Sequence, residues 1–169
     1  QMFKSDLSGK ALSDNVKLED LKLSDGGSLY FKDLGPQIGY TTVFILEYLG
    51  PLLIYPIFLL FPQFIYGEEF KEHHWIVRAA AACWTFHYTK RILETIFVHR
   101  FSHGTMPFGN LYRNCGYYWS FAAFISYFVN HPLFHPPSFG HIQAFIAIGV
   151  FIFSQIGNFS IHIALSNLR

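Results

Sequence analysis

Charged residues are scarce in this sequence. Only 14% of its 169 residues are Asp, Glu, Lys or Arg, whereas soluble domains carry about 25%. The chain therefore lacks the charged surface that a water-soluble domain usually presents. Its formal net charge is +1, so it also lacks the basic excess of a nucleic-acid-binding protein. We expect no nucleic-acid partner.

Cysteine and the common soluble nucleotide motifs are also lacking. The two cysteines, Cys83 and Cys115, are too few for a disulfide framework or a cysteine-based zinc site. There is no glycine-rich dinucleotide fingerprint, no phosphate-binding loop and no nucleophile elbow. The sequence therefore gives no support for a soluble Rossmann reductase.

Histidine is plentiful but poorly spaced for a metal site. The nine histidines include two pairs with three residues between their members, a spacing found in the histidine boxes of membrane di-iron desaturases. These pairs are His99 with His103 and His131 with His135. Desaturases also need boxes that end in two adjacent histidines with a partner shortly before them, and His73-His74 lacks that partner. We predict no metal site.

Apolar and aromatic residues dominate instead, at 51% and 20% of the chain. Four apolar runs are long enough to be helices that cross a bilayer core of about 30 Å at roughly 1.5 Å per residue. The runs are Thr41–Phe61, Ile76–Val98, Tyr117–Phe134 and His141–Leu165. We predict an all-α multi-span membrane bundle of about four spans over residues 35–169.

The first 34 residues are more polar and form a separate unit in our interpretation. Leu7–Leu12 is typical of a strand end with a turn, Val16–Leu23 of a short helical or irregular segment, and Ser28–Phe31 of a strand after a glycine turn. This order resembles the C-terminal half of a ubiquitin-like β-grasp domain. A generic strand–turn–strand piece remains the alternative.

The loops between the runs indicate an orientation. The link from Pro62 to Trp75 is mainly acidic, whereas the link from His99 to Gly116 contains Arg100 and Arg113 and no acid. Cytoplasmic loops favour Lys and Arg. We therefore expect the second link, the N-terminal unit and Arg169 to lie in the cytosol.

Glu47 is the single charged residue of the first apolar run. Ionisable groups at membrane depth usually face a cavity or a partner, so Glu47 is a candidate functional residue. An ion pair with Arg91 is the alternative explanation. Gln37 precedes Glu47 by ten residues, about 15 Å along a helix, so the two side chains would contact different parts of one long ligand.

A second set of polar residues lies in the second run. Tyr88, Arg91 and Thr95 share one helical face, and Lys90 is placed to pair with Glu94 one turn later. A tyrosine hydroxyl near cations can donate a proton or stabilise an oxyanion. The alternative is an interfacial helix end whose cations reach lipid headgroups.

The third set lies at the end of the chain. Asn158, His162 and Arg169 fall on roughly one helical face. Such a stripe at a cytosolic helix end could bind an anionic cofactor such as a nucleotide. Asn158 also begins a glycosylation sequon, but its place inside an apolar run disfavours glycosylation.

These motifs together resemble very-long-chain trans-2-enoyl-CoA reductase, a branch of the steroid 5α-reductase superfamily. The segments that carry the resemblance are Tyr30–Gly35, Glu47–Pro51, His87–Glu94, Phe97–Pro107, Asn114–Trp119, Asn130–Leu133 and Gly157–His162. They cover essentially the whole chain. The family also has a ubiquitin-like domain before its membrane region.

The resemblance implies reduction of the trans-2 double bond of very-long-chain enoyl-CoA with NADPH, the last step of the fatty-acid elongation cycle. It also implies an endoplasmic-reticulum membrane protein that binds acyl-CoA and works beside the other elongation enzymes. The chain begins at Gln1, without an initiator Met, and stops at Arg169 within a polar motif. We therefore expect a fragment that lacks the family's C-terminal region and is inactive alone.

The resemblance also implies roles for individual residues. Gln37 and Glu47 match a Gln and a Glu near the first span of the reductase, which makes them catalytic candidates. Tyr88 matches the tyrosine that holds the substrate carbonyl in steroid 5α-reductases, with Glu47 as its partner. On the nucleotide side, the resemblance matches Asn158 and Arg169 to the cofactor site, whereas at His162 the steroid enzymes carry an Asp.

Lys90 and Arg91 complete the predicted cofactor-binding set. Two alternative functions remain open. One is a steroid 5α-reductase-like enzyme that reduces 3-oxo-steroids, which the N-terminal unit and the Lys90-Arg91 context disfavour. The other is an inactive paralogue that acts as a membrane scaffold.

Overall fold

The structure is a computed structural model of residues 1–169. It describes residues 2–6, 8–13, 16–21, 23, 26–67, 70, 72–101 and 104–168. Four long helices dominate it: α1 (Tyr40–Leu60), α3 (Trp75–Phe97), α4 (Gly109–Val129) and α5 (Gly140–Asn167). A short helix, α2 (Pro62–Tyr66), follows α1.

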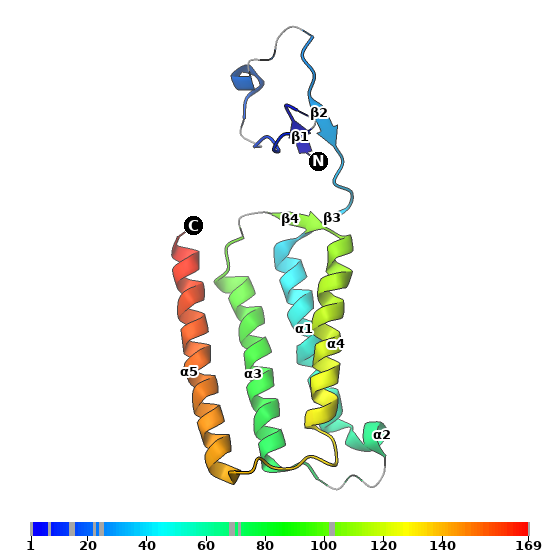
Figure 1. The fold of residues 1–169 in the computed structure, drawn as a ribbon, viewed down its shortest axis with the longest axis vertical. Helices are drawn as coiled ribbons and strands as arrows, with labels where there is room; N and C mark the ends of the chain where they lie inside the picture. Colours follow the sequence, from blue (N-terminus) through cyan, green and yellow to red (C-terminus); the bar gives the residue numbers. More distant parts are fainter. Residues whose placement is uncertain are drawn as a thin grey trace.

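The long helices lie side by side with α1 packed between α3 and α4, and α5 on the outer side of α3 (Figure 1). Two of them, α1 and α5, are long and apolar enough to cross a membrane among the described residues. The predicted helical character of residues 35–169 is therefore confirmed, and these two helices fit the predicted spans. The first candidate span extends from Tyr40 to Leu60 at about 1.5 Å per residue, close to the 30 Å of a bilayer core.

The predicted boundaries are nearly right for three helices and wrong for α4. We expected a loop from His99 to Gly116 and a helix from Tyr117 to Phe134, but α4 begins at Gly109 and ends at Val129. The start of the helix was missed because Asn110, Arg113 and Asn114 are polar, which is typical of a loop. They lie in the first two turns of α4, where Asn114 finds a buried partner across the bundle.

A two-stranded antiparallel sheet ties the start of α1 to the start of α4. Strand β3 (Gln37–Gly39) pairs with β4 (Thr105–Pro107), and Ile38 lies opposite Met106. Met106 is buried with Val43 and Leu111, which come from α1 and α4. This sheet lies across one end of the helices (Figure 1) and fixes the position of Gln37.

The N-terminal unit contains a second, smaller antiparallel sheet. Strand β1 (Met2–Lys4) pairs with β2 (Tyr30–Lys32), and a short 3₁₀ helix, η1 (Leu18–Leu21), lies between them in the chain. The predicted strand near Ser28–Phe31 is displaced by two residues at its start. Half of a β-grasp domain remains a prediction, because the described sheet has only these two strands.

Close packing between α1 and α4 depends on Gly50. A Cβ atom placed on Gly50 would collide with the indole of Trp119 on α4. The same indole donates a hydrogen bond from Nε1 to the carbonyl oxygen of Leu46, at 3.1 Å. On the opposite side of α1, Trp84 of α3 donates to the carbonyl oxygen of Pro51, at 2.9 Å. Two tryptophans, one from α4 and one from α3, therefore hydrogen-bond to backbone carbonyls of α1 that are five residues apart.

We predict that Gly50→Ala destabilises the helix bundle by about 1–3 kcal/mol, because overpacking must displace the Trp119 ring. Gly116→Ala on α4 is the matched control, since a Cβ atom there meets nothing within 4 Å. Thermal unfolding of the full-length protein in detergent provides the measurement. Equal melting temperatures for the two variants would contradict the packing role of Gly50.

Candidate functional site

Polar side chains gather at the end of the bundle that is covered by the β3–β4 sheet. The start of α1, the end of α3, the start of α4 and the end of α5 all lie at this end (Figure 1). Because the long helices alternate in direction along the chain, residues that are far apart in the sequence meet there. The predicted site residues Glu47, Tyr88 and Asn158 come from three of these four helices.

Glu94 is the centre of this polar cluster. Its side chain is 2% exposed, and it contacts three possible cations. Lys90 Nζ lies 2.6 Å from one carboxylate oxygen, and Arg91 Nη1 lies 2.9 Å from the other. His162 Nδ1 lies 3.1 Å from that second oxygen. The predicted pairing of Lys90 with Glu94 is thus present.

The same cations reach α5. Lys90 Nζ donates to Asn158 Oδ1 at 2.9 Å, and Arg91 Nη1 lies 2.9 Å from His162 Nδ1. Four of the five predicted cofactor-binding residues therefore form one connected group between α3 and α5. The fifth, Arg169, lies outside the described residues.

His99, just beyond the end of α3, extends this group. Its Nε2 lies 3.2 Å from His162 Nδ1. Burial is the main cause that lowers the pKa of His99, and the charge of Arg91 lowers it further. The sequence pattern had pointed to His99 as a possible metal ligand paired with His103, which lies outside the described residues.

Glu94, His99 and His162 place possible metal-ligand atoms within 4.8 Å of one another. Arg91 Nη1, however, lies 2.9 Å from both the Glu94 carboxylate and His162 Nδ1. A divalent cation among these three side chains would face the guanidinium charge at close range. The geometry of this cluster therefore favours hydrogen bonding over metal coordination.

A tyrosine cluster connects the cations to α1. Arg91 Nη2 donates to the hydroxyl of Tyr48 at 2.7 Å, and its guanidinium carbon lies 4.9 Å from the centre of the Tyr48 ring. The Tyr48 ring in turn contacts those of Tyr88 and Tyr118, with centroids 6.2 and 5.7 Å away. The Tyr88 hydroxyl makes no hydrogen bond to any other described residue.

Glu47 is buried beside this cluster, next to Tyr48 in α1. It is 3% exposed, and its Oε1 accepts a hydrogen bond from Asn114 Nδ2 at 2.7 Å. The alternative explanation of Glu47 as an ion-pair partner of Arg91 is wrong, because Arg91 is bound to Glu94 and Tyr48. Glu47 and Tyr88 lie in one region of the bundle, because Tyr48, the residue after Glu47, contacts the Tyr88 ring. No hydrogen bond between their side chains is present among the described residues.

Gln37 lies at the same end but in a strand, not a helix. Its Nε2 donates to the carbonyl oxygen of Leu34 at 2.9 Å, and its Oε1 accepts from Thr105 Oγ1 at 3.4 Å. The Gln37 side chain is therefore oriented by its own loop and by the facing strand. The helical separation of about 15 Å does not apply between Gln37 and Glu47, because α1 begins only at Tyr40.

Sequence reasoning missed several members of the site. Asn114 and Tyr118 belong to a segment that carried the family resemblance, but neither had an assigned role. Gln155 on α5, whose side chain pairs with His87 at 3.3 Å, is a polar residue inside an apolar run. An isolated polar residue in an apolar run is the sequence signal that could have identified Gln155 as a site residue.

The sequence is similar to several curated proteins over nearly its whole length. The probable very-long-chain enoyl-CoA reductase of Caenorhabditis elegans is 52% identical over 172 residues, which cover 100% of this chain and 56% of that protein. The very-long-chain enoyl-CoA reductase of Dictyostelium discoideum is 46% identical over 95% of the chain and 52% of its own length. This chain is homologous to very-long-chain enoyl-CoA reductases.

A third relative, the trans-2,3-enoyl-CoA reductase-like protein of Bos taurus, is 41% identical over 94% of the chain and 45% of its own length. The chain thus spans about half the length of the enoyl-CoA reductases that it matches. No family model matches the chain, and no solved structure matches it. The family resemblance read from the sequence motifs is confirmed by these enoyl-CoA reductases.

We predict that Glu94→Gln destabilises the protein by on the order of 3 kcal/mol, because Lys90 and Arg91 would lose their buried counter-charge. Glu19→Gln is the control, since Glu19 forms an exposed pair with Lys17, and exposed pairs contribute little. The measurement is thermal unfolding of the full-length protein in detergent. A Glu94→Gln protein that unfolds at the wild-type temperature would show that the cluster does not hold the helices together.

Proposed function

We propose that this chain is part of an enzyme that reduces the trans-2 double bond of very-long-chain enoyl-CoA with NADPH, the last step of fatty-acid elongation. The observation that carries the proposal is the 52% identity to an enoyl-CoA reductase over the full chain. The buried polar end of the helix bundle supports it, because enoyl reduction needs charge stabilisation in a site that excludes water.

The proposed setting is the endoplasmic-reticulum membrane, with all four long helices crossing the bilayer and the N-terminal unit in the cytosol. Support comes from α1 and α5, which have the length and composition of spans. The helices α3 and α4 lie alongside α1 with similar lengths. Under this arrangement the polar cluster lies near the cytosolic surface, where a water-soluble nucleotide and the CoA headgroup are available.

Tyr88 and Glu47 are the proposed catalytic residues for the thioester. Negative charge develops on the thioester oxygen when the double bond is reduced at C3, and a hydroxyl donor aimed at that oxygen stabilises it. The Tyr88 hydroxyl is suited to this role because it is not engaged by another described residue. Glu47 is held by Asn114 at 2.7 Å, which fixes the carboxyl group inside the same region.

Gln37 is the third proposed catalytic residue. With the N-terminal unit in the cytosol, the Gln37 amide lies at the cytosolic end of the bundle. It is held between the loop before β3 and Thr105 of β4. An amide offers both a donor and an acceptor, so it can orient the polar thioester and pantetheine end of the substrate. Because the β3–β4 sheet holds Gln37 in place, its amide needs little reorganisation on substrate binding.

The proposed nucleotide side consists of Lys90, Arg91, Asn158, His162 and Arg169. The two cations share one carboxylate, Glu94, so the described group keeps a net positive charge even with neutral histidines. That surplus fits the anionic phosphates of a dinucleotide. When bound, NADPH would supply the hydride. The chain's own residues would hold the phosphates and keep water from the reacting carbons.

Other enzymes of the elongation cycle are the proposed protein partners. Each cycle passes a membrane-anchored acyl-CoA from one active site to the next, so proximity in the same membrane shortens transfer. The rest of the full-length protein would complete the cofactor site, since the relatives are about twice as long as this chain.

We predict that Glu47→Gln and Tyr88→Phe each lower NADPH-dependent reduction of a long-chain trans-2-enoyl-CoA by roughly 100-fold or more, the size expected for losing an acid–base or oxyanion group. The full-length protein in microsomes is assayed by NADPH oxidation. The loss should appear in kcat, with the KM for NADPH nearly unchanged, because neither residue contacts the nucleotide in this proposal.

Tyr112→Phe serves as the control, because Tyr112 is an exposed tyrosine on α4 outside the proposed site and should keep wild-type turnover. Wild-type turnover in both Glu47→Gln and Tyr88→Phe would remove these residues from the mechanism. Absence of any enoyl-CoA reduction by the full-length wild-type protein would overturn the proposed function itself.

We also predict that protease added outside intact microsomes cleaves an N-terminal tag on the full-length protein. This follows from the basic residues Arg100, just after α3, and Arg113, in the second turn of α4. The end of α3 and the start of α4 lie at the same end of the bundle as the N-terminal unit (Figure 1). Digestion is compared with and without detergent. A tag that is protected until detergent is added would place the N-terminal unit in the lumen and reverse the orientation.

A further inference from the structure

A closely packed contact between α1 and α4 surrounds Glu47. One turn before it on α1, Val43 belongs to the same buried apolar cluster as Leu111 of α4. About one turn after it, Gly50 lets the Trp119 indole of α4 approach the backbone of α1. Glu47 is therefore held in a part of the bundle where the two helices are in contact on both sides of it.

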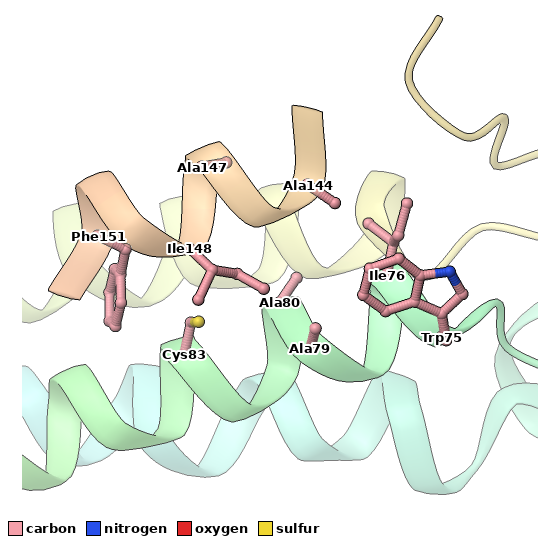
Figure 2. A pocket seen from close by; sticks show the side chains of 9 residues that line it. All are labelled: Trp75, Ile76, Ala79, Ala80, Cys83, Ala144, Ala147, Ile148 and Phe151. Atoms are coloured by element: carbon pink, nitrogen blue, oxygen red, sulfur yellow. The ribbon is translucent and has the colours of Figure 1, made fainter. Parts of the chain in front are cut away.

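The contact between α3 and α5 is more open. An apolar recess of about 230 Å³ lies between these two helices, near their starts. Figure 2 shows Trp75 and Phe151 at its two ends, with small alanine side chains between them. A side chain held between α1 and α4 therefore has firmer support than one held between α3 and α5. Precise placement of a reacting group needs such support.

Asn114 supplies the polar contact within the packed region of α1 and α4. It lies in the second turn of α4, three residues after Leu111. Its Nδ2 donates a hydrogen bond to Oε1 of Glu47 at 2.7 Å. Among the described residues, no other group hydrogen-bonds to this carboxyl group. One neutral amide therefore fixes the direction of a carboxyl group that is 3% exposed.

The second oxygen of the same carboxyl group is available to a ligand. Neither Glu47 Oε2 nor the Tyr88 hydroxyl is among the fully buried polar atoms that lack a partner in the described part of the chain. Tyr48, the residue after Glu47, contacts the Tyr88 ring, so these two groups lie in one region. An amide that holds Oε1 leaves Oε2 as the carboxyl atom that a substrate would meet.

We propose that Asn114 is a positioning residue for the reduction, which holds Oε1 of Glu47 so that Oε2 is presented to the thioester beside the Tyr88 hydroxyl. This inference rests on the catalytic roles proposed above for Glu47 and Tyr88. Asn114 acts through Glu47 and does not itself touch the reacting atoms. Its contribution is that the carboxyl group needs no reorientation when charge develops on the thioester oxygen.

The first test removes the donor. Asn114→Leu in the full-length protein should lower the kcat for a long-chain trans-2-enoyl-CoA roughly tenfold, the size of one net hydrogen bond, with the KM for NADPH nearly unchanged. Asn110→Leu is the matched control and should keep the wild-type kcat. Asn110 lies one turn earlier on α4, and its side chain makes no hydrogen bond to any described residue. A wild-type kcat in Asn114→Leu would overturn the inference.

A double-mutant cycle with Glu47→Gln separates positioning from a structural role. If Asn114 acts through Glu47, adding Asn114→Leu to Glu47→Gln should change the remaining kcat by less than about twofold. A residue that only supports the helix bundle would lower kcat by the same factor in both backgrounds. That additive result would contradict a positioning role.

Asn114→Asp tests the direction of the hydrogen bond and keeps the shape of the side chain if Asn114→Leu does not fold. An ionised carboxylate cannot donate, so kcat should fall at high pH. It should recover as the pH is lowered, because the introduced carboxyl group donates again once it is protonated. Asn114→Asp with the wild-type kcat at every pH would show that the amide accepts from Glu47 rather than donating to it, and would overturn the inference.

The groups around Glu47 allow this pH profile to be interpreted. Thiols and phenols ordinarily ionise well above neutral pH, and Arg stays charged. The groups of these kinds near Glu47 are Tyr48 of α1, Cys115 and Tyr118 of α4, and Tyr88 and Arg91 of α3, which both contact Tyr48. Each rate is divided by the wild-type rate at the same pH, because His99 and His162 on the proposed nucleotide side can titrate in the same range.

Wild-type turnover in the same preparations separates this inference from the proposed function. If the full-length wild type reduces the enoyl-CoA and the Asn114 variants are as active, only the positioning role fails. If the wild type does not reduce the enoyl-CoA, the proposed function fails, and the positioning role fails with it.

Discussion

A buried carboxylate that must be neutralised is the constraint on which the polar end of this molecule depends. Glu94 is almost completely removed from solvent, and an unpaired charge there would cost several kcal/mol. Lys90 and Arg91 neutralise it from the same helix. Because these two cations also bind Asn158, His162 and Tyr48, the demand of one carboxylate joins α3 to α5 and α1. The tertiary contacts of three helices and the charge balance of the candidate site are thus one set of interactions.

The helices of the bundle are held together in two different ways. Apolar packing holds α1, whereas polar contacts hold α5. Helix α1 is packed tightly between α3 and α4, where Gly50 lets the Trp119 indole approach the backbone. Helix α5 buries only Ala144 among its described residues. It is held to α3 mainly by the polar cluster at one end, while a recess remains between the helices at the other end. The other apolar side chains of α5 are exposed. In a membrane, lipid or other helices would cover them.

The charges of the described polar cluster are divided between two sides of the bundle. Two cations share one carboxylate on the α3–α5 side, which leaves a positive excess where the nucleotide phosphates are proposed to bind. On the α1–α4 side, Glu47 is held by the neutral Asn114. Tyr48 lies between these regions and contacts both Arg91 and the Tyr88 ring. A substrate carbonyl near Tyr88 would therefore lie between the positive group and the carboxyl group.

The sequence by itself determined the elements and many of the residues, because long apolar runs and isolated polar residues within them are local signals. The helices near residues 41–61, 76–98 and 141–165, the Lys90–Glu94 pair and the candidate status of Glu47 could all be predicted in this way. The start of α4 could not, since Arg113 and Asn114 are typical of a loop until Asn114 meets Glu47 across the bundle. Tertiary structure alone decided that Arg91 binds Tyr48 rather than Glu47. It also placed Gln37 in a strand beside Thr105. Pairing between residues more than 40 positions apart depends on how the helices pack, and no local pattern encodes that packing.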